Sequence, residues 1–395
     1  MQLRRTQRFG LVRFLLGAAL VVVVAASAAT PALAGRSLVV GVNEDAAKWR
    51  PGLSSIGNDL NFGYYRVTHG WQPGQTAPTD SDTASIASAL ANAGSQKLLL
   101  NVFGSASAAP QNASSRAAYC DFVSALLDRF PQIAAVNIWN EANLSYFWQP
   151  QFNRNGSSAA PAAYEGLLAR CYDTIKSRHP SVRLITSISP RGNDNPRARS
   201  NISHSARNFV NKMGQAYRRS HRRARIFDAW GQNIYGSNSK ERPWVRHRLD
   251  VGEGDYPRLL SYLKSAFGGT RQPVPGQRDV RIWYLEDGFQ TSVAPKRSFY
   301  LSSETDRYVV APLGRSSIPD QASQLTDAVR LAYCQPAVGG FFNFLLADEP
   351  SLHGWQSGVM FADWTPKPSY QAFKNVIAEV RADRVNCAKL RARIN

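Results

Sequence analysis

Residues 135–141 read Ala-Val-Asn-Ile-Trp-Asn-Glu, a short β-prone run that ends in two polar side chains. The run lies between two stretches, 114–130 and 162–178, in which apolar residues recur at three- and four-residue spacing. That spacing is typical of an amphipathic helix, and a short apolar strand between two such helices is typical of a parallel sheet. The stretch therefore predicts a βα unit with Asn140 and Glu141 at the carboxyl end of its strand.

The same unit recurs along the chain, and a third clear helical pattern spans 321–332. The β-rich runs are 38–42, 64–68, 97–103, 135–139, 183–187, 226–233, 280–285 and 340–345. There are eight such runs, and eight parallel strands with helices between them close into a barrel. The sequence thus predicts an α/β fold, a single (β/α)8 TIM barrel over residues 35–395. An open doubly wound sheet is the alternative, but no glycine-rich phosphate loop follows the first run to favour it.

The first 34 residues have the composition of a signal peptide. Arginines at positions 4, 5, 8 and 13 precede an apolar run over 14–29, and Ala32-Leu33-Ala34 forms a small-x-small cleavage pattern. This order of segments predicts export, with cleavage after Ala34 and a secreted, extracellular mature chain. An uncleaved membrane anchor is the alternative. No later segment is long and apolar enough to predict an integral membrane span.

Four cysteines, all after residue 34, predict two disulfide bonds. An even number in an exported chain favours disulfides, and no Cys-x-x-Cys or His-x-x-x-His spacing suggests a metal site. We expect neither a metal nor a cofactor. Cys120 and Cys171 fall in the helices after the third and fourth strands, which are neighbours in the outer ring of a barrel. The same argument joins Cys334, at the end of the helix before the eighth strand, to Cys387 in the last helix.

The chain is strongly basic. Its formal net charge of +19 becomes +15 once the four leader arginines are removed, and five arginines crowd residues 218–225. A basic exported protein is attracted to anionic surfaces such as a cell wall, and we hypothesise that the connection 192–225 contacts an acidic polysaccharide. A solvated helix face is the alternative. Nucleic acid is not expected as a partner, because the run lacks interleaved aromatic residues and the chain lacks a nucleic-acid motif.

Two glutamates end predicted strands on the face where barrels carry their active sites. Glu141 ends the fourth strand and Glu286 the seventh, each after an aromatic-rich apolar run in which a buried charge is costly. Cleavage of a glycosidic bond needs two carboxyl groups, one to protonate the leaving oxygen and one to attack the sugar or to activate water. A carbohydrate substrate is therefore expected. Two salt-bridged rim glutamates are the alternative.

Two motifs resemble glycoside hydrolase clan A. The run 137–141 resembles the Asn-Glu signature that closes strand four in that clan, and 282–288 resembles its strand-seven nucleophile segment. The segment 358–370 resembles the one that follows strand eight in families 5 and 39. The resemblance implies a retaining enzyme for β-linked sugars, with Glu141 as acid/base and Glu286 as nucleophile. Retention implies carboxyl groups about 5 to 5.5 Å apart.

The resemblance also implies roles for further residues. Arg66 matches the clan's strand-two arginine near the nucleophile, and Tyr235 matches its strand-six aromatic, which hydrogen-bonds the nucleophile. Asn140 is implied to bind the sugar 2-hydroxyl. The other substrate-binding candidates are polar and aromatic residues at or near the predicted strand ends: Asn101, His69, Asn233, Trp148 and Trp355.

Three positions depart from the clan pattern. Ala142 follows the acid/base glutamate where the clan often has proline, and Asn233 stands where many members have histidine. Phe344 replaces the tryptophan that usually stacks on sugar at strand eight, and Trp355 in the next loop is the candidate substitute. These departures bear on loop conformation and on sugar contacts rather than on the carboxyl pair.

Other functions fit the sequence less well. The main alternative is a degenerate barrel that binds cell-surface glycans without cleaving them, but both glutamates are present. A serine esterase would need a Gly-x-Ser-x-Gly elbow, which the chain lacks. The sugar, the linkage and endo or exo action depend on loops that the sequence does not predict, and we expect a monomer.

Overall fold

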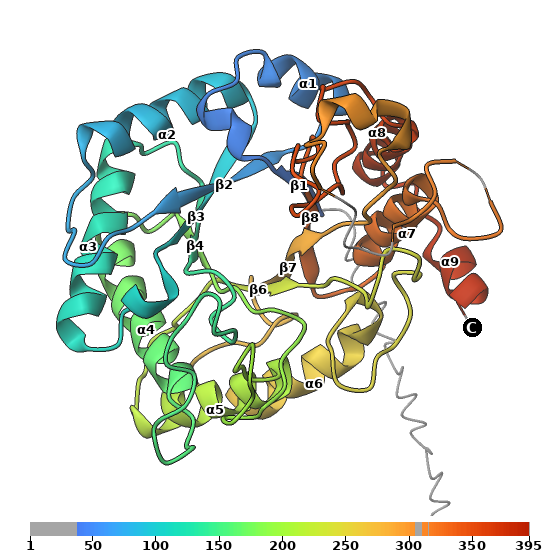
Figure 1. Ribbon diagram of the computed structural model, residues 1–395. Helices are drawn as coiled ribbons and strands as arrows, with labels where there is room; N and C mark the ends of the chain where they lie inside the picture. Colours follow the sequence, from blue (N-terminus) through green and yellow to red (C-terminus); the bar gives the residue numbers. More distant parts are fainter. Residues whose placement is uncertain (1–37, 305–309, 315, 395) are drawn as a thin grey trace, which may run out of the picture. The chain divides into compact units, whose positions relative to one another are not determined.

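A computed structural model describes residues 38–304, 310–314 and 316–394, so the predicted signal peptide lies outside the described residues. Eight parallel strands close into a barrel in sequence order, with β1 beside β8 (Figure 1). Their bounds are β1 Val39–Asn43, β2 Tyr64–Gly70, β3 Lys97–Phe103, β4 Ala135–Ile138, β5 Arg183–Ile185, β6 Ala229–Asn233, β7 Arg281–Asp287 and β8 Val338–Phe344. The predicted single (β/α)8 barrel is confirmed.

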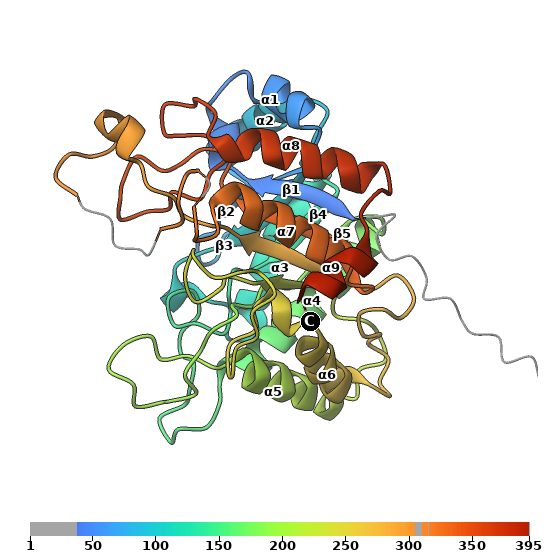
Figure 2. The same cartoon turned by 90° about the vertical axis from the view of Figure 1, so that its right-hand side faces the viewer.

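A ring of helices surrounds the barrel, and α7 and α8 lie side by side in it (Figures 1 and 2). The α-helices are α1 Leu53–Leu60, α2 Asp80–Ala93, α3 Ala113–Arg129, α4 Ala160–Arg178, α5 Ala206–Arg219, α6 Tyr256–Phe267, α7 Gln321–Tyr333, α8 Pro368–Arg381 and α9 Cys387–Ile394. Short 3₁₀ helices are η2 Asp45–Lys48, η3 Ala106–Ala108, η4 Glu253–Asp255 and η5 Ala294–Phe299. Among the described residues, none of these helices has the length and apolar character of a membrane span.

The strands read as near-continuous apolar runs because both of their faces are buried. The outward face packs against the helices, and the inward face fills the lumen with a separate cluster that includes Leu99, Trp283 and Phe342. Gly231 of β6 admits this filling, since a Cβ there would lie 2.5 Å from the side chain of Leu285. The lumen is thus a packed core, and ligands have room only above it, at the carboxyl ends of the strands.

Both predicted disulfides are present. Cys120 of α3 is bonded to Cys171 of α4, and Cys334, at the end of α7, is bonded to Cys387, the first residue of α9. The first bond joins neighbouring helices of the ring, as the barrel topology requires. The second fixes the C-terminal helix to the helix before β8.

Removing the Cys120–Cys171 bond is expected to destabilise the fold substantially. The bond closes a loop with a sequence separation of 51 residues, and a cross-link of that span restricts the unfolded chain by an amount worth about 2–4 kcal/mol. Cys120→Ala/Cys171→Ala should lower the free energy of unfolding by that amount, measured by urea denaturation. Alanine is chosen because both sites are fully buried. A double variant as stable as the parent would contradict this account.

The basic connection 192–225 does not form one surface. Residues 192–205 belong to the loop after β5, at the carboxyl ends of the strands, whereas α5 carries the chain to the opposite end of the barrel. Residues 220–225 therefore lie at the amino ends of the strands. Because α5 spans the barrel between them, the two arginine-bearing segments lie at opposite ends, and the hypothesis that the connection contacts an acidic polysaccharide stays a prediction.

Candidate active site

A cavity of about 980 Å³ opens at the carboxyl ends of the strands. All eight strands or the residues just after them contribute to its lining, which includes Asn43, Arg66, Asn101, Glu141, Ser189, Tyr235, Glu286 and Phe344. Its volume is that of a site for a sizeable ligand. Glu141 and Glu286 thus share one cavity, as the sequence predicts.

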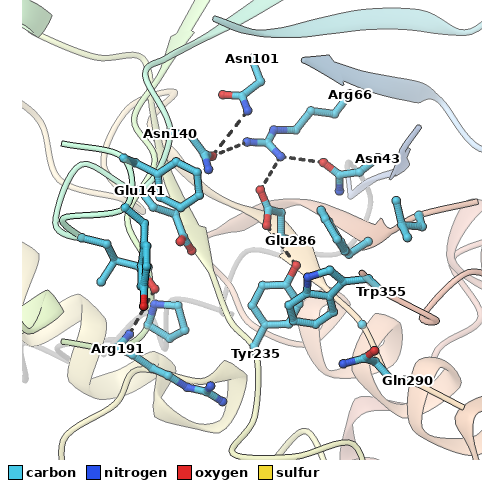
Figure 3. A pocket seen from close by; sticks show the side chains of 18 of the residues that line it. Asn43, Arg66, Asn101, Asn140, Glu141, Arg191, Tyr235, Glu286, Gln290 and Trp355 are labelled. Carbon is cyan, nitrogen blue, oxygen red and sulfur yellow. Dashed lines mark hydrogen bonds and ion pairs between the residues drawn. The ribbon is translucent and has the colours of Figure 1, made fainter. Parts of the chain in front are cut away.

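Glu286 is held by two partners in this cavity. The Arg66 guanidinium donates to Oε1 at 2.6 Å, and the Tyr235 hydroxyl donates to Oε2 at 3.0 Å (Figure 3). Both side chains of the ion pair are buried, with 3% of Arg66 and 10% of Glu286 exposed. A nearby cation and a hydrogen-bond donor both favour the charged form of a carboxyl group. The sequence assignment of Arg66 and Tyr235 to the surroundings of Glu286 agrees with this geometry.

A β-bulge aims Glu286 into the cavity. Alternation along β7 would turn Glu286 outward, because Trp283 and Leu285 both belong to the lumen cluster. The register with β8 slips between Tyr284 and Asp287, so two adjacent residues, Leu285 and Glu286, both face inward. Bulges of this kind re-aim side chains at functional sites. Asp287 is left fully buried outside the cavity.

Arg66 is itself fixed by three asparagines. Its Nη1 donates to Oδ1 of Asn43 at 2.6 Å, and its Nη2 donates to Oδ1 of Asn137 at 2.9 Å and of Asn140 at 3.0 Å. The amide nitrogens of Asn43 and Asn137 donate to backbone carbonyls, at 2.9 Å to Leu285 and 3.0 Å to Trp139. These bonds orient the two acceptor oxygens toward the guanidinium. Residues from or just after β1, β2, β4 and β7 thereby meet at one side chain.

Glu141 has a different environment. Its backbone adopts φ 32° and its N–H donates to Ser187 Oγ at 3.2 Å, while its Oε1 accepts from Asn233 Nδ2 at 2.8 Å. Burial raises the pKa of Glu141 to about 7, and the negative charge of Glu286 adds to the rise. The hydrogen bond from Asn233 opposes it. Glu141 therefore keeps a proton close to neutral pH, beside a carboxylate that is paired with arginine.

Asn140 presents a donor to the cavity. Its Oδ1 accepts from Arg66, from Ser187 Oγ at 3.3 Å and from Asn101 Nδ2 at 3.5 Å. With the oxygen engaged in this way, the Nδ2 group has no acceptor among the described residues and is available to a ligand hydroxyl. Asn101 also lines the cavity.

The structure accounts for the alanine at position 142. The Ala142 N–H donates to the carbonyl of Ser187 at 3.3 Å, and proline has no N–H to donate. Proline at this position would therefore leave the Ser187 carbonyl without that donor. Alanine in place of the clan's proline thus allows the hydrogen bond that joins this loop to the segment after β5.

Aromatic side chains form one wall of the cavity. Trp355 lines it, with its ring centroid 4.9 Å from that of Tyr235 and 5.3 Å from that of Phe344. Tyr146, which is 66% exposed, also lines the cavity. Trp355 therefore lies in the cavity wall next to Phe344, and its contact with a sugar stays a prediction.

A buried ion pair fixes the loop that carries Trp355. Lys367 and Asp348 are joined at 2.7 Å with both side chains fully buried. The Lys367 ammonium also donates to Thr291 Oγ1 and to the carbonyl of Gln356, next to Trp355 in the chain. A buried pair with its remaining donors satisfied holds its surroundings in one arrangement. The aromatic wall is therefore anchored at its base.

Three predicted substrate contacts are wrong: His69, Trp148 and, as described below, Asn233. His69 faces the helices, because Arg66 and Thr68 occupy the inward positions of β2 and His69 follows in the outward one. Its ring contacts Asp82 at 3.2 Å, and its side chain lies outside the cavity lining. Trp148 is fully buried and packs against Trp139, with ring centroids 5.5 Å apart. Trp148 therefore packs beneath the loop that follows β4 and does not line the cavity.

Other contributors were missed by the sequence reasoning. The sequence pattern places Asn137 inside an apolar strand and does not single out Ser187. A polar residue inside a run that is otherwise apolar was the available signal for Asn137. Asn233, predicted as a sugar contact, instead contacts Glu141 and does not belong to the cavity lining.

No protein-family model matches the chain, and no curated protein matches it by sequence. Solved structures do resemble it. A family 39 glycoside hydrolase from the gut symbiont Bacteroides cellulosilyticus WH2 has a TM-score of 0.57 and 17% identity, over 88% of this chain and 64% of that one. The chain thus spans less than two thirds of that relative.

For two further solved structures, the match extends over a larger share of the solved chain. The GH53 catalytic domain of Ignisphaera aggregans has a TM-score of 0.56 and 13% identity, over 88% of this chain and 98% of that one. GH5_18 from Streptomyces cattleya, solved in complex with GlcNAc, has a TM-score of 0.56 and 15% identity, over 88% and 81%. The chain therefore has a closed (β/α)8 fold similar to that of these glycoside hydrolases.

Proposed function

We propose that the chain is a retaining glycoside hydrolase that cleaves β-linked sugars in an oligo- or polysaccharide. The observation that carries the proposal is the contrast between two carboxyl groups in one cavity. Glu286 is paired with Arg66, whereas burial raises the pKa of Glu141 to about 7. Pairs of carboxyl groups whose environments differ in this way divide into a nucleophile and an acid. The β-configuration rests on the resemblance of residues 137–141 and 282–288 to clan A.

In the first step, a carboxylate oxygen of Glu286 attacks the anomeric carbon. The bond from that carbon to the leaving oxygen breaks, and Glu141 gives its proton to that oxygen. In the second step, Glu141, now charged, takes a proton from water as the water oxygen attacks the anomeric carbon and releases Glu286. The Tyr235 hydroxyl and the Arg66 guanidinium hold Glu286 in place through both steps.

The surrounding residues suit sugar binding. The Nδ2 group of Asn140 offers a donor to a hydroxyl beside the reacting carbon, and Asn101 offers a second amide. The ring of Trp355 offers a face for the CH groups of a pyranose.

The proposed enzyme acts outside the cell. The two disulfides are compatible with an oxidising compartment, and the leader sequence predicts export. A protein sampled from the culture medium should therefore begin after Ala34 in N-terminal sequencing.

Hydrolysis of a panel of aryl β-glycosides and β-linked polysaccharides tests the function. We expect cleavage, with the β-anomer as the first product seen by proton NMR before mutarotation. An α-anomer as first product would contradict retention. Binding of glycans without cleavage of any panel member would favour the degenerate barrel instead.

Asn233→Ala is expected to shift the pH dependence of hydrolysis. Its Nδ2 donates to Glu141 and favours the charged form, so its loss should raise the pKa of Glu141 further. A hydrogen bond to a charged group is worth about 1.5 kcal/mol, or about one pH unit. The alkaline limb of kcat/KM should therefore move to higher pH by about one unit. An unchanged profile would show that Glu141 is not the group that titrates.

A further inference from the structure

A basic groove lies at the amino ends of the strands, on the far side of the barrel from the cavity. It has a volume of about 630 Å³, and its lining includes Arg218, His221, Arg222, Arg223 and Arg271. These residues come from the end of α5, the connection to β6 and the turn after α6. Helices α5 and α6 pack side by side in the ring (Figure 1), so the two chain segments form one surface.

Three arginines build the frame of this groove. Arg222 forms a bidentate pair with Asp173, at 2.8 and 2.5 Å, and Arg225 pairs with Asp279 at 2.9 Å. Arg218 donates to backbone carbonyls at the end of α6, including that of Gly268 at 3.1 Å. These three side chains are used in fixing the surface, and two of their charges are matched by acids.

Three more arginines project from this frame. Arg219, Arg223 and Arg271 are exposed, and none has a hydrogen bond or ion pair with another described residue. His221, also exposed, lies between them in the chain. Of the three arginines, Arg219 also interacts electrostatically with the carboxyl group of Glu165. Like charges that acids match only in part repel one another, and an anionic ligand relieves that repulsion. The surface is therefore suited to an anion that carries several charges.

The exposed apolar side chains indicate which polyanion fits. The exposed large hydrophobic residues of the described chain are Trp49, Tyr146, Leu249, Phe299, Leu301 and Ile318. All of them belong to connections after β1, β4, β6 and β7, at the cavity end. Among the described residues that line the groove, Tyr217 is buried and no Trp, Tyr or Phe ring is exposed for bases to stack on, nor any apolar group that could insert into a bilayer.

We propose that this groove is a second, non-catalytic binding site for an anionic polysaccharide. Arg223 and Arg271 line it together with Arg218 and Arg222, and the exposed Arg219 stands next to Arg218 at the end of α5. Charge complementarity supplies the attraction, and the groove gives the polymer a defined course. A chain bound at this end leaves the cavity at the other end open to its own substrate. The site does not depend on the proposed catalysis.

Charge reversal at the three projecting residues tests the proposal. Arg219→Glu/Arg223→Glu/Arg271→Glu is compared with a control, Arg154→Glu/Arg207→Glu/Arg246→Glu, which makes the same change in net charge. The control arginines are exposed and lie in or beside connections at the cavity end. Binding of polygalacturonate is measured by affinity electrophoresis and titration at about 0.1 M salt, where charges more than about 10 Å apart are largely screened.

The groove variant should bind polygalacturonate at least about tenfold more weakly than the parent, and the control less than about threefold more weakly. Its melting temperature should match that of the control, because none of the six side chains has a hydrogen bond or ion pair with another described residue to lose. Equal weakening in both variants would overturn the proposal, since bulk charge would then explain binding. Tighter binding to duplex DNA or to vesicles of anionic phospholipid than to polygalacturonate would overturn it as well.

Discussion

Glu286→Ala is expected to lower kcat/KM by a factor on the order of 10⁴ or more, because it removes the proposed nucleophile. The loss should be seen with aryl glycosides as well as with polysaccharides, since attack on the anomeric carbon is common to both. Initial rates at substrate concentrations well below KM measure it. Unchanged circular dichroism would show that the barrel persists without the Arg66–Glu286 pair.

Azide separates loss of the nucleophile from general damage. Truncation of Glu286 leaves room for a small anion beside Arg66, and the proposed mechanism predicts restored turnover with an α-glycosyl azide as product. Asp287→Asn is the matched control, because Asp287 is the next carboxyl group in the chain and is buried outside the cavity. It should retain activity within about tenfold of the parent. A variant Glu286→Ala that keeps parental activity would remove Glu286 from the mechanism.

Glu141→Gln is expected to lower kcat by about 10² to 10⁴ for substrates with poor leaving groups. An aryl glycoside with an acidic phenol needs little protonation, so its first step should be affected far less. The parent enzyme should lose activity as the pH rises through about 7, because Glu141 must carry a proton to donate one and its pKa is raised to about 7. The variant should lack this alkaline limb.

The leaving-group dependence is the sharper test for Glu141. Rates for a series of aryl glycosides should become steeply dependent on phenol acidity in Glu141→Gln and remain shallow in the parent. Azide should give a β-glycosyl azide with this variant, the opposite anomer from Glu286→Ala. Equal losses for good and poor leaving groups would argue against proton donation by Glu141.

The barrel was predictable because its signal is local and repeated. Each strand is a short apolar run buried on both faces, and the polar residues that end the runs mark the cavity end. The pairing of the cysteines followed from ring adjacency alone. The sequence places Glu141, Glu286, Arg66 and Tyr235 around one cavity because each has a motif or a strand end to mark it.

The side-chain directions were less predictable. A two-residue period along β7 would have turned Asp287, not Glu286, into the cavity, and only the bulge reverses this. The prediction that His69 contacts substrate is wrong although its strand is regular. The inward position of Arg66 fixes the alternation along β2, and this places His69 on the outward face. The prediction that Trp148 contacts substrate is wrong because side-chain directions in a loop follow no regular alternation. The sequence therefore does not indicate that its ring turns toward Trp139.

The cluster of asparagines around Arg66 has a consequence for how this scaffold can change. The side chains that fix Glu286 through Arg66 come from or just after β1, β2 and β4, and Glu286 itself lies on β7. The connection 236–252, which walls the cavity and carries Ser237 and Asn238, holds none of these partners. Grafting a foreign connection in its place should therefore alter which substrates are accepted while preserving the rate of bond cleavage for a small activated glycoside. In the proposed enzyme, the loop that selects the substrate is thus separate from the residues that cleave the bond, and the loop can change in evolution while the cleaving residues stay the same.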